Sequence, residues 1–117
     1  MARYVDGFLL PIPRKNLAAY KRISTLAGKV WREHGALEYR ECVGDDLNIK
    51  VGRAFPKQVK LRRGETVVFS WIVYKSKAHR DRVNQKVMQD SRIKMEDAPF
   101  DIKRMSYGGF EVLVDLV

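Results

Sequence analysis

Residues 66–74, TVVFSWIVY, form the most apolar stretch of the chain and decide its fold. Side chains alternate between the two faces of a strand, and here both alternating sets are almost entirely apolar. Such a strand is typical of the centre of a sheet, where both faces are covered. Because Ser76 can cap a helix directly after it, residues 66–74 are predicted to open a strand-helix-strand unit that ends at residue 117.

The same order of elements is predicted in the first part of the chain, from residue 3 to residue 43. Its predicted elements are a strand over 4–12, a helix over 14–34 and a half-buried strand over 37–43. Pro11 and Pro13 are expected to end the strand because proline cannot donate a backbone hydrogen bond. Gly35 is a natural stop for the helix.

The second unit continues with a predicted helix from Ser76 to about residue 90, a packed loop over 91–103 and a last strand over 105–117. Gly108-Gly109 in that strand predicts either a bulge or the close approach of another backbone. Residues 47–65 are rich in Lys and Arg and leave two alternatives open, a short helix or an extra edge strand.

A β-α-β-β-α-β order of this size is the ferredoxin-like α+β plan, a four-stranded antiparallel sheet with two helices on one face. The chain is predicted to form one such domain over residues 1–117, with the first and third strands inside the sheet. Two helices leave the other sheet face bare although the strands are apolar there. A second copy of the chain is the simplest cover, so we expect a homodimer.

Composition narrows the classes of function. The chain carries a net charge of +9, with 23 Lys and Arg against 14 Asp and Glu, but the basic residues are spread out rather than gathered in a tail. This favours solubility over nucleic-acid binding. No apolar run approaches a membrane span, and no secretory signal is apparent. Cys42 is the only cysteine, which suits the cytoplasm, and there is no metal-binding spacing and no expected cofactor.

Four blocks of sequence resemble a known family of small uncharacterised bacterial proteins typified by YbaA. The blocks are YVDGF at 4–8, ECVGDD at 41–46, VFSWI at 68–72 and PFDIKRMSYGGF at 99–110. The resemblance implies a dimeric α+β barrel, in which two ferredoxin-like subunits close sheet against sheet. That superfamily includes cofactor-independent monooxygenases, lactone isomerases and haem-binding relatives, whereas this family has no settled activity. The basic loop over residues 47–65 departs from the family pattern.

Three strand carboxylates, Asp6, Glu41 and Glu111, are the first candidates for chemistry. A buried carboxylate needs a partner or a wet cavity, because leaving it unpaired costs several kcal/mol. In a cavity between two facing sheets these groups could act as general acid or base. The alternative is a set of ion pairs, with Arg40 and Arg104 as partners.

Ser70, Trp71 and Tyr107 complete the candidate cavity as an amphipathic lining for a small ring-shaped ligand. The alternative for Trp71 and Tyr107 is packing in a core or interface. A shift of one residue in strand register would turn each candidate to the opposite face.

Three functions remain open from the sequence. The first is a homodimer that binds a small organic molecule between its sheets. The second is RNA binding, since RNA-recognition modules share this element order, although the third strand lacks their basic-Gly-aromatic-Gly opening. The third is a structural or stress-related dimer without a ligand. The catalytic residues and the identity of a ligand stay unknown.

Overall fold

The computed structural model describes residues 2–94 and 98–117. Its elements are the strands β1 (Tyr4–Pro13), β2 (Glu38–Val43), β3 (Glu65–Tyr74) and β4 (Ser106–Glu111) and the helices α1 (Leu17–Glu33), α2 (Phe55–Gln58) and α3 (Lys77–Met88). Short 3-10 turns cover Arg14–Asn16 and Ile102–Arg104. Part of the loop predicted over 91–103, including Met95, lies outside the described residues.

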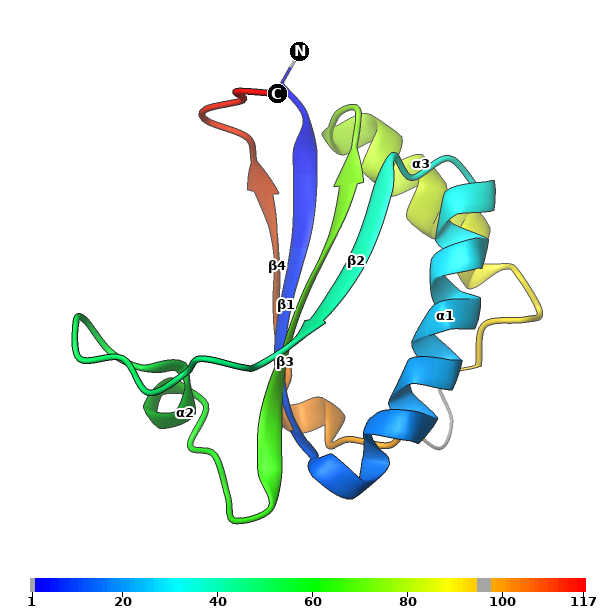
Figure 1. Ribbon diagram of the computed structural model, residues 1–117. Helices are drawn as coiled ribbons and strands as arrows, with labels where there is room; N and C mark the ends of the chain where they lie inside the picture. Colours follow the sequence, from blue (N-terminus) through cyan, green and yellow to red (C-terminus); the bar gives the residue numbers. More distant parts are fainter. Residues whose placement is uncertain (1, 95–97) are drawn as a thin grey trace.

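The strands form one antiparallel sheet in the order β2-β3-β1-β4, with α1 and α3 on one side of it (Figure 1). β1 and β3 pair along their full lengths, from Tyr4 opposite Tyr74 to Pro13 opposite Glu65. The ferredoxin-like α+β plan is confirmed, and β1 and β3 are the interior strands as predicted. In residues 47–65, the short helix α2 is found and not an edge strand.

The even-numbered side chains of β1 and β3 face the helices and make the core. The core has two clusters of buried residues, one with Val30, Ala36, Ile72, Tyr74, Val83 and Val87 and one with Leu10, Ile12 and Val68. The first cluster joins the sheet to both long helices. The second lies toward the start of α1, where Leu17 and Tyr20 pack against it. Ser76 caps α3 as predicted, because its hydroxyl accepts the N–H of His79 at 3.1 Å.

We call the opposite side of the sheet the open face. Its central part is lined by Val5, Gly7, Leu9, Phe69, Trp71, Gly108 and Phe110. α2 lies on this side (Figure 1), and the ring of Phe55 is 6.3 Å from that of Phe69. Even so, Phe69 is 46% exposed and Phe110 is 62% exposed. The open face is therefore apolar and only partly covered by its own chain.

The ends of two strands differ from the prediction. β4 ends at Glu111, so the expected strand up to residue 117 was wrong. The reason is its partner: β1 begins at Tyr4, and the carbonyl of Arg3 already accepts the N–H of Val112 at 3.0 Å. β1 in turn continues to Pro13. β4 pairs with β1 only as far as Leu9, so no strand on that side requires a backbone N–H from Pro11 or Pro13.

Gly108-Gly109 does not form a bulge, since Gly7 faces Gly108 and Asp6 faces Gly109 in regular register. The close neighbour is a side chain and not a backbone. A Cβ on Gly109 would lie 2.5 Å from the hydroxyl oxygen of Tyr4. No helix in the described part of the chain is long and apolar enough to cross a membrane.

We predict that Gly109→Ala lowers the free energy of unfolding by about 1–3 kcal/mol, because the new methyl group displaces the ring of Tyr4. The neighbouring Gly108→Ala is the control, since its Cβ would meet Phe110 no closer than 3.7 Å. It should leave stability unchanged or raise it by up to about 1 kcal/mol. Urea unfolding of both variants measures the difference, and equal stabilities would contradict the packing seen around Tyr4.

Candidate functional site

The register aligns polar residues of several strands in two neighbouring rows on the helix-covered face. The first row, from β2 to β4, is Glu41, Ser70, Phe8 and Tyr107. The second is Tyr39, Ile72, Asp6 and Gly109. Side chains in one row are direct cross-strand neighbours and can interact. The sheet thus brings four predicted site residues close together.

The two faces separate the six candidates. Asp6, Glu41, Ser70 and Tyr107 point to the side of the helices, whereas a cavity between two facing sheets would need them on the open face. Trp71 is on the open face, in a row with Arg40. Glu111 faces Tyr4 at the exposed end of β4.

The expected ion-pair partners also differ. Arg104 binds Glu65, with 2.6 Å between Nη1 and Oε2, and Arg40 lies 3.5 Å from Glu38. The partner of Asp6 is Arg80 of α3. Sequence spacing could not show the pairs of Arg104 and Asp6, because each joins residues of separate elements. Glu38 and Arg40 are two residues apart in β2 and therefore share a strand face.

A pocket of about 420 Å³ opens between α1 and the sheet. We call it the α1 pocket. Its walls come from both core clusters, among them Phe8, Leu10, Tyr20, Trp31, Tyr39, Ile72, Phe100 and Met105. Ile23 and Leu26 of α1 also line it and are 47% and 43% exposed. α1, from Tyr20 to Trp31, and the sheet therefore leave an apolar hollow between the two core clusters.

Glu41 is the carboxylate in the wall of the α1 pocket. Two phenols donate to it, Tyr20 to Oε1 and Tyr39 to Oε2, the latter at 2.8 Å. Burial, followed by the negative charge of Glu41, raises the pKa of both Tyr20 and Tyr39 well above the ordinary value. Both tyrosines therefore stay protonated and serve as fixed donors to the carboxylate.

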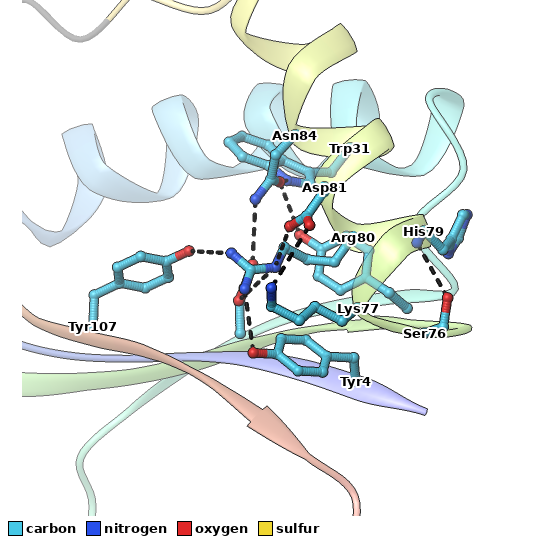
Figure 2. A network of polar contacts seen from close by, with 11 residues as sticks. Tyr4, Trp31, Ser76, Lys77, His79, Arg80, Asp81, Asn84 and Tyr107 are labelled. Atoms are coloured by element: carbon cyan, nitrogen blue, oxygen red, sulfur yellow. Dashed lines mark hydrogen bonds and ion pairs between the residues drawn. The ribbon is translucent and has the colours of Figure 1, made fainter. Parts of the chain in front are cut away.

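Asp6 is the centre of a second polar cluster, where α3 packs on the sheet. Figure 2 shows its partners Arg80 and Asn84 on α3 and the phenols of Tyr4 and Tyr107. The carboxylate of Asp6 is 1% exposed, lies 3.7 Å from Nε of Arg80 and accepts a hydrogen bond from Asn84 at 3.4 Å. Arg80 donates in turn to the phenol oxygens of Tyr4 at 3.2 Å and of Tyr107 at 3.5 Å. These contacts bind α3 to β1 and β4.

Asn84 links this cluster to the rest of the core. Its side-chain oxygen accepts from the indole N–H of Trp31 at 3.0 Å and from the phenol of Tyr74 at 3.1 Å. Trp31 also lines the α1 pocket beside Tyr39, so this one residue of α1 lies next to both polar clusters, that of Asp6 and that of Glu41. Between the centres stands Phe8, whose ring stacks on that of Tyr107 with 4.8 Å between centroids.

Burial sets the charge of Asp6. It is the largest influence and raises the pKa of the carboxyl, while the charge of Arg80 and the hydrogen bond from Asn84 lower it in part. Burial and the charge of Asp6 also raise the pKa of Tyr107. A raised carboxyl pKa is found at catalytic acids, but burial in a structural cluster raises the pKa of a carboxyl in the same way.

Several residues of these centres were missed from the sequence, namely Tyr4, Tyr20, Trp31, Tyr39, Arg80 and Asn84. One signal was available: positions 80, 84 and 87 share a helix face with the buried Val83, and polar residues occupy two of them. Another was the two-residue spacing of Tyr39 and Glu41, which puts them on one strand face. Among the described residues, no group of three or more His, Cys, Asp or Glu is placed to hold a metal ion.

Comparison with known proteins gives consistent results. The model of a family described as "Protein of unknown function (DUF1428)" matches residues 3–102. The chain is 44% identical over 115 residues to "Uncharacterized protein YbaA" of Escherichia coli strain K12, covering 97% of this chain and 98% of that protein. The same figures hold for the protein of that name from Shigella flexneri.

Among solved structures, the fold is similar to "Crystal Structure of Putative Antibiotic Biosythesis Monooxygenase from Bacillus cereus". The TM-score is 0.59 at 10% sequence identity, and the match covers 100% of this chain and 99% of that one. At this identity the likeness concerns the fold.

We predict opposite pH dependences for two aspartate variants. Because the pKa of Asp6 is raised in the folded state, the wild-type protein loses stability relative to Asp6→Asn as pH rises through that pKa. The pKa of Asp90 is lowered by hydrogen bonds from Arg92 and His34, so the wild type gains stability relative to Asp90→Asn as pH rises. Urea unfolding from pH 3 to pH 8 measures both slopes, and slopes of the same sign would contradict the assignment.

Proposed function

The chain belongs to the DUF1428 family of proteins of unknown function, and on that premise we propose that it binds a small, largely apolar organic molecule in the α1 pocket. The observation that supports this most is the pocket itself, an apolar hollow of about 420 Å³ with a hydrogen-bonded carboxylate in its wall. Ligand sites are typically concave and apolar, with a few placed polar groups and volumes of roughly 300–1,000 Å³.

The energetics of the pocket walls support a ligand. Ile23, Leu26 and Ile102 each keep more than two-fifths of their surface exposed around the hollow. Covering apolar surface is favourable by roughly 25 cal/mol per Å². A ligand with an apolar body gains this free energy when it binds. A hydrogen bond between its polar group and the carboxylate of Glu41 then fixes its orientation. The pocket lies within one copy of the chain, so binding needs no residue of a second copy.

We also propose that the chain forms a homodimer through the open face. This face carries exposed aromatic rings on two strands, Phe69 on β3 and Phe110 on β4, around a second apolar hollow of about 500 Å³. Charged side chains lie at the margins of this face, at the β2 edge, where Glu38 and Arg40 pair with each other, and at the start of β3, where Glu65 pairs with Arg104. An apolar centre with a polar edge is the usual composition of an interface, and a two-fold axis lets the same patch serve both copies.

RNA binding is the competing use of the same surface. Exposed aromatic side chains on a sheet can stack bases, and the chain is basic. The homodimer and an RNA complex exclude each other because both need the open face to be free. The two are therefore separated by one measurement, the stoichiometry of the purified protein with and without added RNA.

We predict that Ala27→Phe abolishes ligand binding or weakens it at least about tenfold, because the ring fills the α1 pocket from the helix side. Ala18→Phe is the control, since Ala18 is on the same helix but exposed to solvent. A metabolite library is screened by thermal shift against the wild type, and the ligands that stabilise it are measured by calorimetry on both variants. Ligands that bind Ala27→Phe as well as they bind the wild type would contradict the pocket assignment.

We predict that Phe110→Glu converts a dimer into a monomer, weakening association by at least about tenfold, or about 1.4 kcal/mol. The control is Met88→Glu, which puts the same charge on an apolar side chain that is 58% exposed on α3. Light scattering during size-exclusion chromatography gives the masses. A wild-type protein that is monomeric at micromolar concentration would refute the homodimer, and retention of RNA at low salt would favour the competing function.

A further inference from the structure

Most side-chain donors in the α1 pocket already form hydrogen bonds within the chain. Tyr20 and Tyr39 both donate to Glu41, and the hydroxyl of Ser24 donates to the backbone carbonyl of Lys21 at 3.4 Å. Arg92, which lines the pocket at its rim, is bound to Asp90 and Glu33. A ligand oxygen that needs a donor is therefore left, among the described lining residues, with Ser70 and with two exposed cations, Lys94 and Arg40, the latter paired with Glu38 through Nε.

Acceptor capacity, in contrast, remains free. A carboxylate has about four lone-pair positions on its two oxygens, and the phenols use one on each oxygen of Glu41. Within the described residues, no Lys, Arg or His lies within ion-pair distance of Glu41. Its negative charge is thus hydrogen-bonded by neutral groups but not neutralised.

The aromatic walls add a second feature that selects charge. Trp31 and Tyr39 lie 6.1 Å apart, and Tyr20 meets the edge of Phe100 at 5.7 Å. Ring faces attract a cation placed within about 6 Å, by about 0.5–2 kcal/mol. The basic side chains of α1, Lys21, Lys29 and Arg32, line an outer groove on the other side of Glu41, where water screens them.

We infer, on the basis of the proposed ligand-binding function, that the α1 pocket takes an organic amine. The ammonium group donates to the free lone pairs of Glu41 and neutralises its charge. The apolar or aromatic body of the ligand lies against Phe8, Trp31 and Phe100. A carboxylic acid of the same shape finds Ser70 as a donor but no buried counter-charge among the described lining residues, and it binds less well.

Three compounds with the same phenylbutyl body test this: 4-phenylbutylamine, 4-phenylbutan-1-ol and 4-phenylbutyrate. Their affinities for the full-length chain and for Glu41→Gln are measured by calorimetry at neutral pH. We expect the wild type to bind the amine about tenfold more tightly than the alcohol, and the carboxylate most weakly. In Glu41→Gln the amine and the alcohol should bind equally, since the amide carries no charge. The change also turns one acceptor oxygen into a donor nitrogen, which affects both ligands.

Tyr39→Phe is the second variant. It tests whether a substitution beside Glu41 disrupts the fold of the pocket, and whether the phenol itself selects the amine. It removes one donor to Glu41, so the preference for the amine should be kept or should rise. A carboxylate that binds as tightly as the amine, or an amine preference that survives in Glu41→Gln, would overturn the amine assignment while the pocket still stood. Failure of all three compounds to bind the wild type would refute both the amine assignment and the use of this pocket for such ligands.

Discussion

The antiparallel pairing of β1 with β3 is the constraint on which the rest of the structure depends. Each of the ten residues from Tyr4 to Pro13 has one partner in β3, so a single register fixes the face of every side chain in the sheet centre. With this register the even-numbered residues meet α1 and α3, and Phe69 and Trp71 remain on the open face. A slip of one residue would bury the open-face set and expose Asp6, Leu10 and Ile12. The core, the α1 pocket and both polar centres therefore follow from one alignment.

The sequence was sufficient for the elements whose evidence is spread over many residues. The apolar run at 66–74 identified the central strand, and the repeated strand-helix-strand order identified the topology. The end of β4 was not predictable in the same way, because the alternation of residues 112–117 continues the pattern of a strand. Whether it pairs depends on how much of β1 remains beside it, and β1 begins at Tyr4. Strand ends are set by a partner elsewhere in the chain and not by local pattern.

The candidate site shows a similar division. Alternation puts Asp6 on one face with Phe8 and Leu10, and Tyr39 on one face with Glu41, because it fixes relative faces within one strand. It could not tell which face the helices cover, since that depends on the crossover connections. Arg80 and Asn84 were not predicted as site residues, because a polar side chain on a helix is usually exposed to solvent. Here Asp6 lies opposite them, and burial of the carboxylate makes the two side chains its partners.

Two buried or half-buried carboxylates on one sheet are stabilised in different ways, and the difference assigns them different roles. Asp6 has an arginine beside it, so its charge is balanced inside the protein and its contacts hold α3 on the sheet. Glu41 is held by two neutral phenols, so its charge is not balanced and faces an open pocket. In the cross-strand row, Phe8 lies between Glu41 and Tyr107 and stacks on the ring of Tyr107, which belongs to the Asp6 cluster. The chain as a whole is strongly positive, with a net charge of +9, yet the wall of its α1 pocket presents a negative group. The global charge disfavours the approach of a cation, so selectivity for one has to come from the contact with Glu41 inside the pocket.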